Sequence, residues 1–214
     1  MKDFDPGEET EKSSRKLPHW EQNKCTYFIT FRLADSIPAG KFAEWNEERH
    51  RWLRSRKLDP SLPLDENLEK LDSKQKKIYY ETFWKNYHDL LDNCHGSCML
   101  RNPANSKIAA DALLFFDNKR YILGDFVVMP NHVHLLVTPY SDHPLSELLH
   151  TWKRFTASEI NKHMKREGQL WQPESYDHIV RNEEQLKRIQ RYIQNNPKNL
   201  KPSEFYLHQG RTAL

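Results

Sequence analysis

The stretch VVMPNHVHLLV, residues 127–137, decides the fold, because it combines a run of apolar strand formers with two histidines at alternate positions. Successive side chains of an extended strand point to opposite faces of a sheet, so His132 and His134 should share one face and Val133 should lie on the other. Positions two apart in a strand are about 6.5 to 7 Å apart, so two imidazoles can converge on one ion. The pattern therefore favours a divalent metal site. Two separately hydrogen-bonded histidines at a sheet edge are the alternative.

Length and composition indicate a polar chain with enough aromatic mass for a core. The chain has 214 residues, a mass of 25.7 kDa and a mean hydropathy of −0.92, which suits one large domain or one domain with an insertion. Six Trp, nine Tyr and ten Phe are available to fill its interior. No apolar run approaches the roughly 18 residues of a membrane span, so we expect no membrane partner.

The start of the chain and its cysteines predict a cytoplasmic protein. Residues 1–16 lack the apolar segment of a signal peptide and are interpreted as a disordered leader. Three cysteines are an odd number, which argues against a disulfide framework. Cys94 and Cys98 could join a zinc site, but no second cysteine pair accompanies them, so ordinary thiols are the favoured interpretation.

Alternating and helical patterns divide the remaining chain into strands and helices. The predicted strands comprise residues 25–33, 121–130 and 132–139, with a short or irregular strand within 170–180. The predicted helices comprise residues 41–58, 73–94, 106–116, 144–168 and 182–196. Ser146 is expected to help start the fourth helix and Gly168 to close it, and Asn182 is expected to cap the fifth.

This order of elements predicts an α+β fold, in which helices pack on an antiparallel sheet. The two helices within about 40–105 interrupt the sheet and are expected to form a helical insertion. A single domain would then span residues 17–200, followed by a tail at 201–214.

Positive charge is concentrated in the C-terminal third, although the net charge of the chain is only +3. Residues 151–201 contain eleven Lys and Arg against six Asp and Glu, a net of +5, so the other residues together carry −2. Such a distribution suits a polyanionic partner. A solvated helix surface is the alternative.

The histidine stretch also resembles a known family. In MPNHVHLLV a hydrophobic residue separates the two histidines, as in the HUH single-strand DNA nucleases, and more narrowly the stretch is similar to the REP-associated tyrosine transposases. Blocks of the chain resemble this family in its order, namely LPHWEQNKCTYFITFRLADSIP (17–38), VVMPNHVHLLVTP (127–139), WKRFTASEIN (152–161), LWQPESYDHIVRNEEQL (170–186) and RYIQNNP (191–197). The resemblance implies a ferredoxin-like or RRM-like HUH nuclease core.

The family pattern implies a tyrosine nucleophile on a late helix beside the histidine strand. Tyr192 is the first candidate and Tyr176 is the reserve. At 100° per residue, Asn196 falls about 20° from Ile189, within the apolar stripe of the last helix, and Tyr192 falls about 60° from it. An amide in a stripe that faces a core makes sense where the stripe meets a polar site. Tyr192 and Asn196 are also four residues apart, hence neighbours on one helix face.

The resemblance also implies a metal ligand four residues after the tyrosine, a position that Asn196 occupies in place of the more frequent glutamine. Together with His132 and His134 it forms the predicted metal-binding set. Mg²⁺ or Mn²⁺ is expected, because the set contains no thiolate and should leave coordination positions open.

The implied activity is cleavage and rejoining of single-stranded DNA through a 5′-phosphotyrosine intermediate at hairpin elements. Single-stranded or hairpin DNA is therefore the expected partner, bound by a monomer or a homodimer. Two aromatic residues, Trp171 and Tyr176, are candidates for base stacking, with core packing as the alternative. The candidates for phosphate contacts are Lys153, Arg154, Lys187, Arg188 and Arg191.

Two other functions remain open from the sequence. One is a nucleic-acid-binding protein that has the fold and the basic surface but no catalysis. The other is a metal-dependent hydrolase in which water attacks and no covalent adduct forms.

Overall fold

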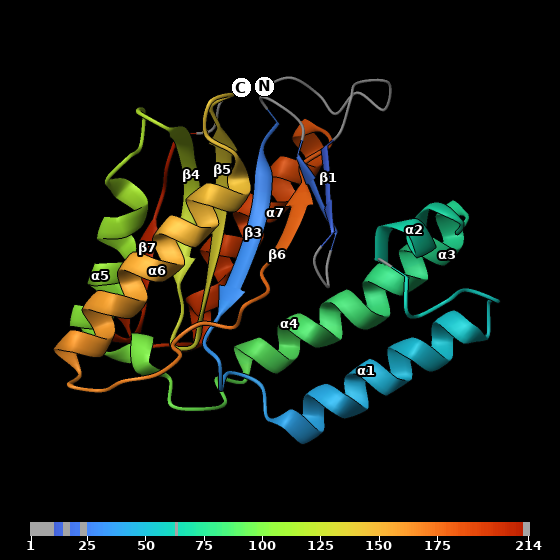
Figure 1. Cartoon of the computed structure of the whole chain (residues 1–214), viewed down its shortest axis with the longest axis horizontal. Coiled ribbons are helices and arrows are strands. Elements are labelled where there is room, and N and C mark those ends of the chain that lie inside the picture. Colours follow the sequence, from blue (N-terminus) through green and yellow to red (C-terminus); the bar gives the residue numbers. More distant parts are fainter. Residues whose placement is uncertain (1–10, 15–17, 22–24, 63, 212–214) are drawn as a thin grey trace.

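A five-stranded antiparallel sheet is the centre of the computed structural model, which describes residues 11–14, 18–21, 25–62 and 64–211. The strand order is β6-β3-β5-β4-β7, and all neighbours are antiparallel (Figure 1). The strands are β3 (Tyr27–Arg32), β4 (Tyr121–Val128), β5 (His132–Pro139), β6 (Tyr176–Ile179) and β7 (Tyr206–His208). With its helices this sheet confirms the predicted α+β class.

The predicted break at Pro130 and Asn131 is the turn between β4 and β5. Met129 N donates to the carbonyl of His132 at 2.8 Å and closes this hairpin. Along β4 the register shifts between Leu123 and Phe126. Gly124 lies at this irregularity, and a Cβ built on it would lie 2.9 Å from Cβ of Leu136, so the close approach of the two strands requires glycine there.

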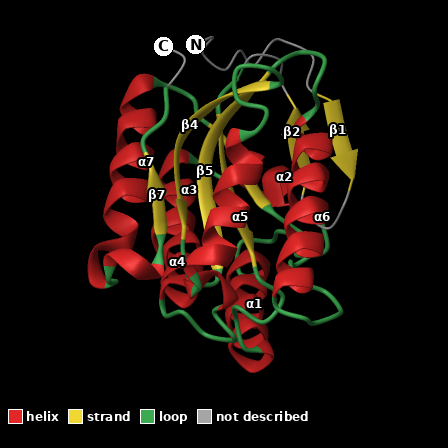
Figure 2. Cartoon of the chain, turned by 90° about the vertical axis from the view of Figure 1, so that its left-hand side faces the viewer, coloured by secondary structure: helices red, strands yellow, loops and turns green. Residues whose placement is uncertain are grey.

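Helices cover both faces of the sheet. Two of them, α5 (Pro103–Leu114) and α6 (Leu145–His163), pack on one face, and α7 (Glu183–Asn195) packs on the other. Figure 2 shows α6 and α7 on opposite sides of the strands. Three of the predicted helices, 106–116, 144–168 and 182–196, correspond to these elements.

The two faces of β5 differ as the alternation of its sequence predicts. Val133, Leu135 and Val137 belong to the large apolar cluster under α5 and α6. Leu136 belongs to the smaller cluster under α7, and His134 stacks on Phe28 of that cluster with 5.4 Å between ring centroids. The side of the sheet under α7 therefore carries the polar positions.

The helices that follow β3 and precede α5 extend away from the sheet (Figure 1). They are α1 (Ala39–Arg54), α2 (Leu64–Glu69), α3 (Ser73–Tyr79), the π-helix η1 (Tyr80–Trp84) and α4 (Lys85–Asp92). These helices have a separate small core, in which Trp45 Nε1 donates to the carbonyl of Phe83 at 3.1 Å and Trp52 packs on Phe83. The predicted helix 73–94 is therefore three consecutive segments, with a π-helical turn in the middle.

The predicted N-cap of α7 agrees with the structure, whereas the predicted start and end of α6 do not. The Asn182 side chain accepts a hydrogen bond from Gln185 N at 2.9 Å and caps α7, as predicted. The expected role of Ser146 is wrong, because Pro144 holds the N-cap position of α6 and no side chain caps it. Gly168 does not close this helix, which ends at His163, since Lys165 already adopts a left-handed φ of 49°.

Three strands lie where the sequence predicted none. Within the expected leader, Glu11–Ser14 form β1, which pairs with β2 (Pro18–Glu21); the other residues of 1–16 lie outside the described residues. Within the expected tail, β7 pairs with β4 at the edge of the sheet. The remaining elements are the 3₁₀ turns η2 (Met99–Arg101), η3 (Asn196–Asn199) and η4 (Pro202–Glu204).

The sequence predicted neither a disulfide framework nor a membrane span. Cys25, Cys94 and Cys98 are free thiols, and Cys98 Sγ donates to the carbonyl of Cys94 at 2.9 Å. Burial raises the pKa of Cys94 to about 11. Among the described helices, none has the length and apolar composition needed to cross a bilayer.

Candidate metal centre and tyrosine site

The two histidines of β5 meet in the interior. Both side chains are fully buried, and their Nε2 atoms are 3.0 Å apart. Burial lowers the pKa of His132 to about 3 and also lowers the pKa of His134, to which His132 and His88 add a further lowering. The rings are therefore neutral at physiological pH, which is the protonation state that a metal ligand needs.

Asn131 fixes the tautomer of His132. Its Nδ2 points at three backbone carbonyls, those of Ser36, Leu91 and His95, at 3.2 to 3.5 Å, so the orientation of the amide is determined. Its Oδ1 lies 2.7 Å from Nδ1 of His132 and can only accept. Nδ1 therefore carries the proton, and the lone pair of neutral His132 is on Nε2, directed at the other side chains of the site.

Thr30 of β3 orients the second histidine. Its Oγ1 lies 2.7 Å from Nδ1 of His134, opposite which it stands in the sheet register. A hydroxyl both donates and accepts, so Thr30 can hold either neutral tautomer of His134. When it accepts, both Nε2 atoms of the pair present lone pairs, and a cation between them would relieve the resulting repulsion.

Tyr192 on α7 reaches this pair. The stripe formed by Leu186, Ile189 and Ile193 is buried against the sheet, and it holds α7 so that Tyr192 faces β5. The Tyr192 hydroxyl is 3.2 Å from Nε2 of His134. Burial raises the pKa of Tyr192, and the charges of Asp92 and Asp89 raise it further, so the phenol is protonated at physiological pH.

Helix α4 contributes two side chains that the sequence did not predict for the site. His88 is buried, and its Nδ1 lies 3.1 Å from the Tyr192 hydroxyl. Asp92, one turn later on the same face, has its Oδ1 3.6 Å from Nε2 of His132. Burial lowers the pKa of His88 to about 3 and raises the pKa of Asp92 to about 6.

Donor atoms of Asp92, His132 and His134 all lie within 4.8 Å of one another, so these three residues could hold one metal ion. Asn196, the predicted third ligand, lies beside them. Its Nδ2 donates to both oxygens of Asp92, at 3.2 and 3.3 Å. Its Oδ1 is buried and has no hydrogen-bond partner among the described residues, which leaves an acceptor available to an ion.

A comparison with protein families matches residues 103–196 to the family described as "Transposase IS200 like". The match covers 94 of the 214 residues of the chain. One solved structure similar to the chain is described as "Structure of the REP associates tyrosine transposase bound to a REP hairpin". The two sequences are 14% identical, the match covers 87% of this chain and 74% of the chain in that structure, and the TM-score is 0.45. No curated protein gave a significant match.

The IS200-like segment contains His132, His134, Tyr192 and Asn196, but it excludes His88 and Asp92, which precede it. Neither of these two had a usable signal in the sequence. Asp92 and His88 precede the first histidine of β5 by 40 and 44 residues along the chain, and the apolar spacing of their helix predicts only packing. The i, i+4 spacing of His88 and Asp92 was the one available hint.

The reserve tyrosine of the IS200-like segment lies near the site but in a different position. Tyr176, on β6, shares a side-chain hydrogen bond with Trp84 and packs on Phe28 and His88 at ring-centroid distances of 6.5 and 6.1 Å. Burial raises the pKa of Tyr176 strongly. No hydrogen bond joins Tyr176 to the histidine pair among the described residues, so the geometry favours Tyr192.

Trp171 is a core residue, and its predicted role in base stacking is not supported. It is buried at 5% exposure, and its ring packs edge-on against Phe31 with centroids 4.8 Å apart. Its Nε1 donates to Oγ1 of Thr156 on α6 at 2.8 Å. The sequence could not separate this role from stacking, because aromatic residues serve both purposes.

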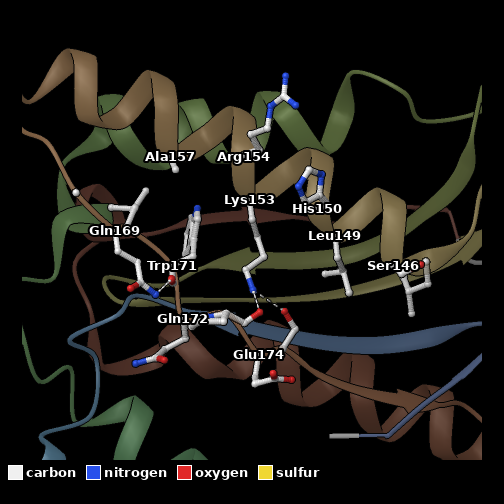
Figure 3. Close-up of a pocket in the computed structure, with 15 residues that line it drawn as sticks. Ser146, Leu149, His150, Lys153, Arg154, Ala157, Gln169, Trp171, Gln172 and Glu174 are labelled. Carbon is white, nitrogen blue, oxygen red and sulfur yellow. Dashed lines mark hydrogen bonds between the residues drawn. The ribbon is translucent and has the colours of Figure 1, made fainter. Parts of the chain in front are cut away.

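Lys153 and Arg154 lie on α6, on the face of the sheet opposite the histidine pair. They border a cavity of about 530 Å³ between α6 and the segment that follows Gly168. Lys153 Nζ donates to the carbonyl of Pro173 at 2.8 Å and lies 3.0 Å from Oγ of Ser175. Figure 3 shows Lys153 reaching across this cavity and Arg154 pointing away from it. Neither side chain meets the tyrosine site.

Lys187, Arg188 and Arg191 are exposed on α7, within one turn or so of Tyr192. Lys187 is paired with Glu183 at 2.6 Å, and Arg191 Nε donates to the carbonyl of Lys187 at 3.3 Å. Of the five predicted phosphate contacts, these three lie on the element that carries the candidate nucleophile.

Proposed function

We propose that the protein is a metal-dependent, single-strand DNA transposase that cleaves and rejoins DNA through a 5′-phosphotyrosine on Tyr192. The observation that carries the proposal is the 3.2 Å separation between the Tyr192 hydroxyl and Nε2 of His134. A phenol held against a buried imidazole pair combines a nucleophile with donors for a cation. The match of residues 103–196 to a transposase family supports the same activity.

The covalent step balances without a further reactant. The Tyr192 oxygen forms a bond to the phosphorus of a phosphodiester, and the bond from that phosphorus to the 3′ oxygen breaks. The phenolic proton leaves Tyr192, and the departing 3′ oxygen gains a proton to give a free 3′-hydroxyl. The reverse reaction with another 3′-hydroxyl rejoins DNA, because the phosphotyrosine retains the energy of the original ester.

The residues present fit a divalent cation. Neutral imidazoles at His132 and His134, the Asn196 amide oxygen with no partner and a nearby carboxylate form an N,O donor set without thiolates. Such a set suits Mg²⁺ or Mn²⁺. When bound, the cation would act as a Lewis acid that stabilises charge on the phosphate oxygens.

His88 is proposed to orient the nucleophile. Its Nδ1, 3.1 Å from the Tyr192 hydroxyl, can accept the phenolic hydrogen bond when His134 uses its Nε2 lone pair for the cation. The hydrogen bond would leave a lone pair of the phenolic oxygen free to attack. His88 Nε2 is buried and has no hydrogen-bond partner among the described residues, and Nδ1 is the nitrogen that meets the tyrosine.

Hairpin DNA with a single-stranded flank is the proposed substrate, from the resemblance to REP-associated tyrosine transposases. The exposed basic side chains of α7, Lys187, Arg188 and Arg191, are proposed to contact DNA phosphates near Tyr192. Such contacts weaken as the salt concentration rises.

The test is incubation of labelled single-stranded hairpin DNA with the protein and Mg²⁺ or Mn²⁺, followed by a denaturing gel. A covalent adduct is expected with the wild type and with Tyr176→Phe, and its loss is expected with Tyr192→Phe. Loss in Tyr176→Phe alone would move the nucleophile to β6. Cleavage without any adduct would indicate a hydrolase, and binding without cleavage would indicate a non-catalytic DNA-binding protein.

A further inference from the structure

The end of α4 brings a carboxylate to the histidine pair from outside the segment that matches the transposase family. Asp92 belongs to the helical insertion, whereas His132 and His134 begin β5. We propose that Asp92 is a direct, anionic ligand of the catalytic cation, so that the helical insertion completes the metal centre. The inference rests on the proposed function and adds a residue and a role for the insertion to it.

The first support is a conflict between acceptors. Asn131 places the proton of neutral His132 on Nδ1, so Nε2 carries a lone pair. The nearest oxygen of Asp92 is 3.6 Å from that Nε2, and an ionised carboxylate also only accepts. Two acceptors that face each other at this distance repel, and a positive charge between them would relieve the repulsion. A cation supplies it without protonating a fully buried imidazole.

The second support is the chemistry of the donors. Without Asp92 the set consists of two imidazoles and an amide, all of them neutral. Mg²⁺ and Mn²⁺ prefer anionic oxygen ligands, and protein sites for Mg²⁺ usually include one or two carboxylates. Asp92 supplies the only carboxylate in the metal-binding group found among the described residues.

The third support is the spacing of the donor atoms. Two ligands about 2.1 Å from one ion lie about 3.0 Å apart at right angles and about 4.2 Å apart on opposite sides. The separation of the two Nε2 atoms is 3.0 Å, and that from Nε2 of His132 to Asp92 is 3.6 Å. Both values fall within this window, and the donor atoms of all three residues lie within 4.8 Å of one another.

The surroundings hold Asp92 in place for this role. Asn131 donates to the carbonyl of Leu91, the residue before Asp92, and the same amide orients His132. Asn196 donates to both carboxylate oxygens. A single buried asparagine thus positions two ligands from distant parts of the chain, and a second one steadies the carboxylate. The arrangement has the form of a supporting shell around a metal site.

The experiment measures Mn²⁺ binding to the full-length protein without DNA, by calorimetry and by the loss of the free-Mn²⁺ electron paramagnetic resonance signal. Asp92→Asn should raise the Mn²⁺ dissociation constant by about tenfold or more. Asp89→Asn is the matched control, because Asp89 is exposed on the same helix and carries the same charge; it should change the constant by less than about twofold. Unchanged circular dichroism and Tm would show that both variants fold.

A second readout follows the insertion itself. Saturating Mn²⁺ should slow hydrogen exchange of the backbone amides of α4 in the wild type and in Asp89→Asn, but not in Asp92→Asn. If Asp92→Asn binds Mn²⁺ as tightly as Asp89→Asn, or α4 gains protection in both, the inference is wrong.

The double variant His132→Ala/His134→Ala separates this inference from the proposed function. Loss of Mn²⁺ binding in the double variant with full binding in Asp92→Asn would leave the histidine centre intact and reject only the carboxylate ligand. Full binding in the double variant would reject the proposed metal centre, and with it the role of Asp92.

Discussion

The two faces of the sheet are built from the same strands but for different tasks. Under α5 and α6 the side chains of β5 are aliphatic, and even the buried hydroxyl of Tyr121 is satisfied by the carbonyl of Leu113 at 2.6 Å. Under α7 the same strand presents His132 and His134, and the partly buried hydroxyl of Tyr192 lies within hydrogen-bond distance of the imidazoles of His88 and His134. One face is a closed core, and the other is a polar cluster with acceptors left over.

The contrast between the two faces shows how one strand, β5, can carry a polar site on one side and a stabilising apolar core on the other. Because alternate residues face opposite sides, a site can be placed on one side at little cost to packing on the other. Hydrogen-bond capacity remains unused within the site: among the described residues, His88 Nε2 and Asn196 Oδ1 are buried without partners. Buried polar atoms without partners cost free energy, and the site keeps them where a ligand would use them.

The largest expected effect separates the two buried tyrosines. Tyr192→Phe should lower formation of the covalent DNA adduct by about a thousandfold or more, because no other oxygen replaces the nucleophile. Tyr121→Phe should keep adduct formation but lower the free energy of unfolding by about 1 to 3 kcal/mol, since it leaves the indole of Trp152 and the carbonyl of Leu113 without their partner. Denaturing gels and urea unfolding of both variants measure this. Equal loss of adduct in the two variants would erase the distinction between the faces.

Truncation on the two sides of β5 should also have opposite consequences. Leu135→Ala should lower the free energy of unfolding by about 2 to 5 kcal/mol, because Leu135 is fully buried in the apolar cluster. It should leave the Mn²⁺ affinity within about twofold of the wild type. His134→Ala should abolish measurable Mn²⁺ binding. Chemical unfolding and calorimetry test this pair, and a Leu135 variant that loses the metal would show that the faces are coupled.

A pH dependence of stability should arise on the α7 side. Burial lowers the pKa of His178, which lies against Gln185, to about 4, from 6.5 when exposed. The unfolded chain therefore binds a proton that the folded chain does not between these values. Stability present above pH 6.5 is lost as the pH falls toward 4, by up to about 1.4 kcal/mol per pH unit. His178→Gln should reduce the wild-type slope by the contribution of one histidine, and the other buried histidines should keep the rest. Unfolding from pH 7 to 4.5 measures this; an identical slope would contradict it.

The smallest expected effect concerns surface charge. Arg188→Ala and Arg191→Ala should each weaken hairpin DNA binding severalfold and reduce the dependence of log affinity on log salt by about 0.9. Lys153→Ala, on the opposite face, should leave that slope unchanged, because Lys153 is bound to Pro173 and Ser175. Binding titrations at several salt concentrations decide this. If only Lys153→Ala changed the slope of log affinity against log salt, the DNA would bind on the α6 side of the sheet.

Much of this arrangement could be predicted from local patterns. Alternation along β5 predicted that His132 and His134 share one face. Helical spacing made Tyr192 and Asn196 neighbours on one helix, and the family resemblance implied that this helix lies beside the histidine strand. The insertion residues could not be found in this way. His88 and Asp92 meet the histidines only through the docking of α4, a long-range contact that leaves no periodic signal. β7 was missed because a three-residue edge strand has too little pattern to recognise.

The most direct measurement of the central claim is to map the site of DNA attachment by mass spectrometry. Trypsin cleaves after Lys and Arg, so Tyr192 falls in the peptide 192–198 and Tyr176 in the peptide 167–181. After reaction with hairpin DNA, Mn²⁺ and nuclease trimming, a nucleotide phosphate is predicted on the peptide 192–198, attached to Tyr192. Attachment to Tyr176, or to any tyrosine outside α7, would contradict the account.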